Sequence, residues 1–94
     1  MQTLKETEIE KALSELDQWN HEGEFIKRSF TFENFKEAFS FMSRVAFEAE
    51  ELMHHPNWDN VYNKVNISLN THDAGGITQK DIDLAARIDA IAKS

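Results

Sequence analysis

One long amphipathic segment constrains the fold more than any other part of this 94-residue chain. Asn34 can cap a helix that runs from residue 35 to about residue 53, because Asn is a favoured N-cap residue. Apolar residues recur along the segment at helical spacing, which is typical of a helix that buries one face in a core. This stripe consists of Phe35, Ala38, Phe39, Met42, Val45, Ala46, Ala49, Leu52 and Met53. We therefore expect this segment to form the central core helix.

Two pairs of strands are predicted, one on each side of this helix in the sequence. Residues 25–32 alternate around the interruption of Arg28, which we expect at a sheet edge with its stem packed and its charged head in water. Trp19 stands before them on a possible short first strand, with a turn near Gly23. Residues 58–62 and 65–71 form the second pair, joined by a two-residue turn. The strict alternation of residues 65–71 makes them the clearest strand and places His72 on its polar side.

Helices are predicted at both ends of the chain. Thr7 and Glu10 have capping-box spacing at the start of residues 7–16, and Thr78 and Asp81 have it at the start of residues 78–92. The order is therefore α-β-β-α-β-β-α. Strands joined by short turns pair antiparallel, so we predict an α+β fold: a four-stranded antiparallel sheet with the helices packed on one face. We expect residues 1–94 to form a single domain.

Composition excludes several functional classes. The net charge of −7 argues against direct nucleic-acid binding, because phosphate contacts need a basic face. The sequence has no cysteine for disulfides, thiolate metal sites or thiol catalysis, and no apolar run approaches the roughly 20 residues of a membrane span. We expect a cytoplasmic protein. Because a chain of this length buries a modest core, self-association is a natural source of further buried surface, and Phe47, which lies off the apolar stripe, is the candidate interface residue.

The clearest candidate site is a group of three histidines in two neighbouring connections. His54 and His55 lie at the predicted corner between helix and strand, and His72 follows the second strand of the next pair. Imidazole exchanges a proton near neutral pH, since its unperturbed pKa is about 6.5. Pro56 disfavours helical backbone at the residue before it, which we expect to end the helix and to point the two adjacent histidines in different directions.

Two carboxylates are placed to join these histidines. The helical phase puts Glu50 on the shoulder of the apolar stripe, whereas Glu51 faces solvent. Asp81 projects on the apolar side of the last helix, where the helix dipole and the free N–H groups of the first turn would stabilise its charge. Geometry therefore favours Glu50 and Asp81 as members of a site.

The residues alone leave three interpretations open. The histidines could be surface or capping residues. They could bind zinc or non-haem iron with the carboxylates, although adjacent histidines in an extended segment point apart and the helical motif with two His at i and i+4 is absent. Alternatively, they could perform metal-free general acid–base catalysis, for which divergent histidines reach different positions around one planar ligand. No nucleophile-elbow motif and no phosphate-binding Gly loop is present.

A longer pattern resembles a known family. Glu50-x3-His54-His55-Pro56-x-Trp58, followed by Asn60-Val61-Tyr62-Asn63-Lys64-Val65, by Thr71-His72-Asp73 and by Asp81, is similar to the pterin-4a-carbinolamine dehydratases. The resemblance extends from about residue 30 to residue 92. It implies dehydration of 4a-hydroxytetrahydropterin to quinonoid dihydropterin, which returns reduced pterin to aromatic amino acid hydroxylases. It also implies that no cofactor or metal is used.

The resemblance assigns residues to this activity. His54 and His55 would be the main acid–base catalysts, with His72 binding the ring and assisting proton transfer. The pterin-binding set that it implies is Glu50, Met53, His54, His55, Pro56, Trp58, Asn70, Thr71, His72, Asp73 and Asp81. Met53 departs from an Asp that is common at this position in animal members.

The same resemblance suggests assembly and alternative functions. Family members form homodimers or homotetramers, which would explain an off-stripe Phe47. Some animal relatives also stabilise the dimer of a homeodomain transcription factor, so a non-enzymatic protein-binding role is the main alternative. A pterin-binding accessory protein of another pterin or molybdopterin pathway is a third. A protein that acts only as a scaffold does not need to keep all three histidines, which favours the enzyme.

Overall fold

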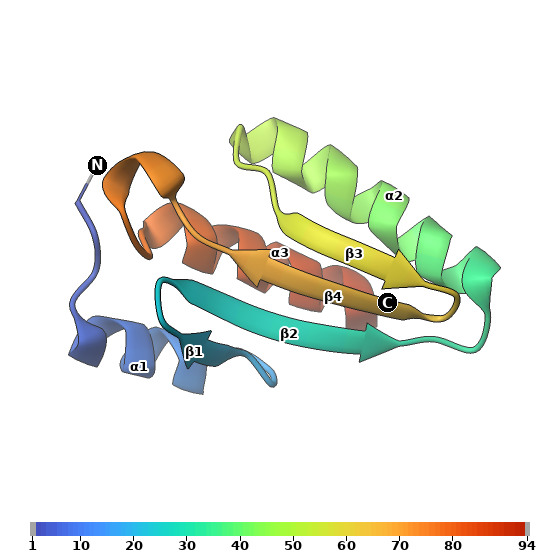
Figure 1. Ribbon diagram of the computed structural model, residues 1–94, viewed down its shortest axis with the longest axis horizontal. Helices are drawn as coiled ribbons and strands as arrows, with labels where there is room; N and C mark the ends of the chain where they lie inside the picture. The colour runs from blue at the N-terminus through green and yellow to red at the C-terminus, as the bar shows by residue number, and fades with distance from the viewer. Residues whose placement is uncertain (1, 94) are drawn as a thin grey trace.

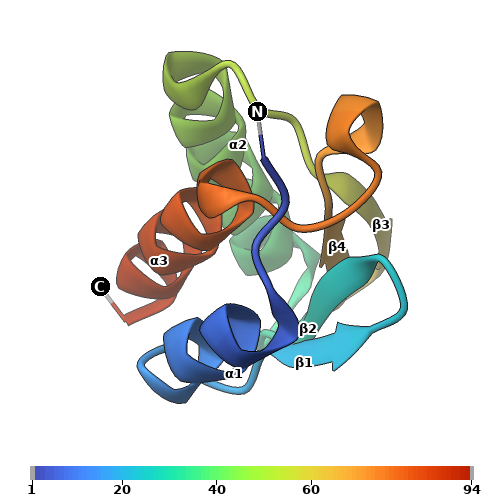
Figure 2. The same ribbon diagram turned by 90° about the vertical axis from the view of Figure 1, so that its left-hand side faces the viewer.

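The computed structural model describes residues 2–93. The predicted order of elements is confirmed, with one short 3-10 helix added before the last helix (Figure 1). The elements are α1 (Glu6–Ser14), β1 (Asn20–Glu22), β2 (Phe25–Thr31), α2 (Phe35–Leu52), β3 (Asn57–Val61), β4 (Lys64–Leu69), η1 (His72–Ala74) and α3 (Gln79–Lys93). The four strands pair antiparallel in the order β1-β2-β4-β3. All three α-helices lie on the same side of this sheet, as predicted (Figure 2).

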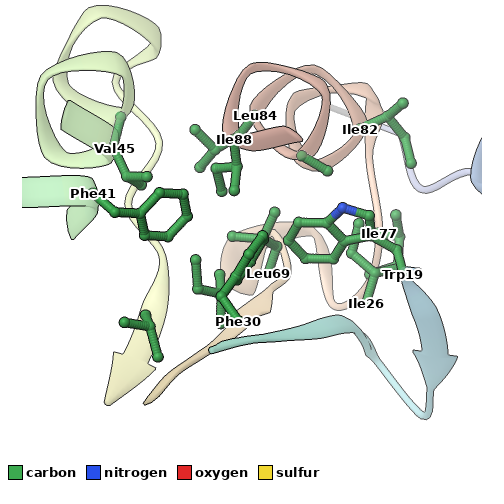
Figure 3. Packing of buried hydrophobic residues seen from close by; sticks show 14 of the residues in the cluster. Trp19, Ile26, Phe30, Phe41, Val45, Leu69, Ile77, Ile82, Leu84 and Ile88 are labelled. Atoms are coloured by element: carbon green, nitrogen blue, oxygen red, sulfur yellow. The ribbon is translucent and has the colours of Figure 1, made fainter. Parts of the chain in front are cut away.

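The core fills the space between the sheet and the helices α2 and α3 (Figure 3). Strand β4 alternates as predicted: Val65, Ile67 and Leu69 are buried and face the helices. The other face of the sheet carries polar side chains, where Ser29 Oγ donates to Asn66 and the Asn66 amide donates to a third strand. These side-chain pairs satisfy the polar groups of a sheet face that no helix covers.

Helix α2 begins at the predicted cap, since the Asn34 side chain accepts a hydrogen bond from the Glu37 N–H at 2.9 Å. Its predicted apolar stripe is partly wrong. The buried residues are Ala38, Phe41, Val45 and Ala49, whereas Phe35, Phe39 and Met53 are 50%, 58% and 70% exposed. Phenylalanines occur on both sides of this helix, so apolar character alone did not distinguish the packed side. The small Ala38 and Ala49 lie on the side that contacts the core.

The prediction for Arg28 is wrong about its charged head. Strand β2 lies between β1 and β4, but β1 pairs only as far as Lys27, so Arg28 lies just beyond the part of β2 that has strands on both sides. Its side chain is only 11% exposed, and the head is not in water. Its Nη1 is 2.6 Å from Oδ1 of Asp89 on α3, and its guanidinium lies 4.2 Å from the centre of the Phe30 ring. A charged head can be buried here because a carboxylate distant in sequence neutralises it.

The N-terminal segment departs in detail from the prediction. Helix α1 begins one residue earlier and ends at Ser14, and its box is formed by the Lys5 N–H donating to Glu8 at 2.7 Å, not by Thr7 and Glu10. Trp19 precedes β1 and is buried. Within residues 2–93, none of the helices has the length and apolar character that a membrane span requires.

Candidate active site

The C-terminal end of α2 positions the first histidine. Met53 adopts a left-handed conformation, with φ 52° and ψ 43°, and its N–H bonds to the carbonyls of Ala49 and Glu50. The His54 N–H bonds to the Ala49 carbonyl at 3.0 Å, which completes the Schellman pattern of a helix C-terminus. Met53 therefore ends the helix, and the prediction that Pro56 does so is wrong. Pro56 instead precedes the extended backbone of β3.

His54 contacts a fully buried carboxylate. Its Nε2 lies 2.5 Å from Oδ1 of Asp81, with the His54 side chain 11% exposed and the Asp81 side chain 0% exposed. Oδ2 of Asp81 accepts hydrogen bonds from the Thr71 hydroxyl and from the Thr78 N–H, each at 2.8 Å. The bond from the Thr78 N–H confirms the carboxylate half of the predicted capping box. Asp81 thus connects the end of α2, the segment after β4 and the start of α3.

These contacts define the proton positions. A buried carboxylate that meets hydrogen-bond donors at a helix N-terminus is stabilised as the anion, and an anionic carboxylate can only accept. The Nε2 of His54 must therefore carry a proton and donate it to Asp81. In the neutral ring, Nδ1 is then the nitrogen that can accept a proton from a ligand or return it.

The second histidine has a separate carboxylate. His55 Nε2 lies 2.5 Å from Oε2 of Glu50, and these side chains are 62% and 70% exposed. Glu51 points elsewhere and accepts a hydrogen bond from Arg87 at 2.8 Å. The carboxylates of Glu51 and Glu48 raise the pKa of the Arg87 guanidinium above its ordinary value. The adjacent histidines therefore diverge as expected, each directed by its own acid.

His72 follows the strand, as predicted, but the strand ends before the predicted residue 71. Strand β4 ends at Leu69, and His72 opens η1 with its side chain exposed. The turn is closed by a bond from the Thr71 N–H to the Gly76 carbonyl at 2.8 Å, and Gly75 adopts the left-handed conformation that glycine permits. Thr71 donates a hydrogen bond to Asp81, which contacts His54. His72 follows Thr71 directly in the sequence. Figure 1 places η1, the start of α3 and the end of α2 at the same end of the molecule.

The remaining predicted residues differ in burial. Met53 and Asp73 are exposed, and Pro56 and Asn70 are half-buried. Trp58, on β3, is half-buried and packs against the core. Sequence reasoning missed Thr78 as a member of the group, although the Thr-x-x-Asp spacing marked it as a cap. Over residues 2–93, no cluster of three or more His, Asp or Glu side chains has the geometry to hold a metal ion.

Comparison with known proteins identifies the family. The family model described as pterin 4 alpha carbinolamine dehydratase matches residues 2–91. The chain belongs to this family. It is 53% identical over 94 residues to a protein of Christiangramia forsetii named "Putative pterin-4-alpha-carbinolamine dehydratase", covering 100% of this chain and 97% of that protein. A protein of the same name from Mesorhizobium japonicum is 53% identical over 88 residues, covering 92% of this chain and 90% of the relative.

Solved structures of two related proteins have the same fold. A transcriptional coactivator/pterin dehydratase from Brucella melitensis superposes with a TM-score of 0.93 at 46% identity, covering 96% of this chain and 98% of the other. A pterin dehydratase-like protein identified as a RuBisCO assembly factor in the alpha-carboxysome superposes with a TM-score of 0.68 at 25% identity, covering 84% and 92%. The expected family and its α+β fold are thus confirmed.

Proposed function

We propose that this protein dehydrates 4a-hydroxytetrahydropterin to quinonoid dihydropterin by metal-free acid–base catalysis with His54, His55 and His72. The observation that supports this most strongly is the contact between His54 Nε2 and the buried Asp81 carboxylate. An imidazole held by a carboxylate through one nitrogen presents the other nitrogen for proton exchange, and its cationic form is stabilised when a proton arrives. The membership of the chain in the dehydratase family supports the choice of a pterin substrate.

The reaction needs two proton transfers. One proton goes to the hydroxyl on the carbinolamine carbon, so that the C–O bond breaks and water leaves. Another is removed from the adjacent ring N–H, whose electron pair forms the new C=N bond. We assign Nδ1 of His54 to one transfer and the exposed His55, supported by Glu50, to the other, with His72 binding the ring and assisting. Each positioned histidine contributes about 10²–10⁴-fold to such a step.

The histidine variants test this proposal. His54→Ala and His72→Ala should each lower the dehydration rate by at least about tenfold while leaving the fold intact, because neither side chain belongs to the hydrophobic core. Stopped-flow measurement of carbinolamine dehydration, with circular dichroism as the control for folding, gives the result directly. Rates equal to wild type in both variants would remove the histidines from catalysis. Exhaustive chelation should leave activity unchanged, and a loss restored by zinc would support a metal site instead.

We further propose that the protein acts in the cytoplasm in pterin recycling, as a homodimer or homotetramer. Phe47 on α2 is 75% exposed, which supports a role in self-association. Phe47→Glu should therefore lower the mass measured by sedimentation, since a charge in an apolar contact is costly to bury. An unchanged mass, with the exposed Glu24→Gln variant as control, would place the contact elsewhere.

A second candidate function is protein binding. Phe35, Phe39 and Phe47 are exposed on α2, and the two solved relatives are described as a transcriptional coactivator/pterin dehydratase and as a RuBisCO assembly factor. A strain that carries His54→Ala separates the two functions. If it has the phenotype of a gene deletion, catalysis is the required function, whereas a wild-type phenotype would support protein binding.

A further inference from the structure

We propose that Thr71 and Thr78 are positioning residues: their hydroxyls form a directed hydrogen-bond chain that holds Asp81 as the anion and thereby fixes the tautomer of His54. This inference goes beyond the assigned catalytic histidines, and its kinetic consequence rests on the proposed dehydration. Its structural consequence, the position of the proton on His54, does not. Thr71 was expected to line the pterin, and the structure gives its hydroxyl a different partner.

Three contacts form the chain. The Thr71 hydroxyl lies 2.8 Å from Oδ2 of Asp81, the two threonine hydroxyl oxygens are 2.7 Å apart, and the Lys80 N–H lies 3.3 Å from Oγ1 of Thr78. Thr78 is 0% exposed. The chain thus begins at the Lys80 N–H in the first turn of α3 and ends on the carboxylate.

The direction of the chain follows from counting hydrogens. Each hydroxyl has one hydrogen to donate. The carboxylate only accepts, so the hydrogen of Thr71 is directed at Asp81. The short contact between the hydroxyls then requires Thr78 to donate to Thr71, and Thr78 in turn accepts from the Lys80 N–H. Every member donates toward Asp81, with the backbone N–H at the far end.

This direction excludes a proton on Oδ2. The Thr78 N–H and the Thr71 hydroxyl both point at that atom, so a proton there would face two donors. A backbone N–H cannot reverse its direction. The proton shared with His54 therefore lies either on Oδ1 or on Nε2. The two donors on Oδ2 stabilise the carboxylate as the anion, so they favour the proton on Nε2 and keep Nδ1 available to the ligand.

The test uses Thr71→Val, which keeps the shape and removes the hydroxyl, with Thr71→Ser as the variant that retains it. Long-range ¹H–¹⁵N correlation spectra of ¹⁵N-histidine-labelled protein, at a pH where the ring is neutral, report the tautomer of His54. We expect wild type and Thr71→Ser to hold the Nε2–H tautomer and Thr71→Val to shift a measurable fraction to Nδ1–H. We also expect Thr71→Val to lower kcat by about tenfold with KM within about twofold, and Thr71→Ser to restore kcat.

Two controls keep the inference falsifiable. Thr31→Val replaces an exposed threonine on β2 and should change neither measurement. If Thr71→Val does not fold because the buried Thr78 hydroxyl loses its acceptor, the Thr71→Val/Thr78→Val double variant removes both partners with shapes retained and is expected to fold. An unchanged His54 tautomer in the folded variant would overturn the positioning role. A shifted tautomer in a protein without dehydration activity would support the chain of donors and refute the proposed function.

Discussion

Helix α3 carries two buried aspartates whose carboxylates have different kinds of partner. Asp81 and Asp89 are 0% and 5% exposed, and the carboxylate of each contacts three hydrogen-bonding groups. Asp89 accepts from the Trp19 indole N–H at 2.7 Å, from Arg28 at 2.6 Å and from the Asp17 N–H at 3.0 Å. Asp81 contacts an imidazole, a hydroxyl and a backbone N–H.

The partners decide what each aspartate can do. The guanidinium of Arg28 is not deprotonated in proteins, so the charge next to Asp89 is fixed and the contact can only hold elements together. An imidazole can gain and lose a proton near neutral pH, so in the proposed reaction the charge next to Asp81 changes. Burial by itself therefore does not mark a catalytic carboxylate. The partner must be able to exchange its proton.

Removal of Asp89 from its ion pair with Arg28 should have the largest effect on stability. Asp89→Ala leaves Arg28 buried without its closest acceptor and should lower the free energy of unfolding by about 3–5 kcal/mol. The contact of the Arg28 guanidinium with the Phe30 ring does not replace the lost carboxylate. Urea denaturation measures the loss, with the exposed Asp83→Asn on the same helix expected to stay within about 0.5 kcal/mol of wild type. A loss below about 1 kcal/mol would mean that the pair does not stabilise the fold.

Asp81→Asn should act mainly on activity. The amide cannot serve as an anion beside His54, and its NH₂ group must face either the imidazole or the two donors on Oδ2, so the histidine loses its defined tautomer. We expect kcat for dehydration to fall by about a hundredfold. Stopped-flow assays of folded protein would show this, and Asp83→Asn is again the matched control. A wild-type kcat in Asp81→Asn would mean that Asp81, like Asp89, contributes to structure and not to catalysis.

The smallest expected effect concerns the turn that presents His54. A left-handed conformation costs a non-glycine residue about 1–2 kcal/mol. Glycine avoids this cost, but it loses more conformational entropy on folding, which offsets part of the benefit. Met53→Gly should therefore stabilise the protein by about 0.5–1 kcal/mol in urea denaturation. Met53→Ala keeps the unfavourable backbone and should show no gain. Destabilisation by glycine would mean that the exposed Met53 side chain contributes more than its backbone costs.

Local patterns predicted much of this molecule. Alternation identified β4, Asn34 marked the start of α2, and Thr78 with Asp81 marked the start of α3. The helical phase favoured Glu50, which contacts His55, over Glu51, which contacts Arg87, although the two side chains are 70% and 69% exposed. These features depend on residues within a few positions of one another, and sequence spacing reports such relations well.

Long-range contacts could not be predicted in the same way. Nothing near Arg28 in the sequence indicates a carboxylate 61 residues later, and Phe41 could not be preferred over Phe39 without knowing which side of α2 meets the sheet. The turn at Met53 was missed because glycine is the usual signal for left-handed backbone. Thr78 was recognised as a cap, but its contact with Thr71 depends on how β4 and α3 meet.

The indole of Trp19 gives the structural aspartate an optical label. The chain has two tryptophans, and Trp19 donates its N–H to Asp89, whereas Trp58 lies on β3, four residues after His54. A Trp58→Phe variant thus leaves one tryptophan, which is hydrogen-bonded to the Asp89 carboxylate that joins Arg28 on β2 to α3. Its emission would report whether the contacts of Asp89 are intact, without a contribution from Trp58 on β3.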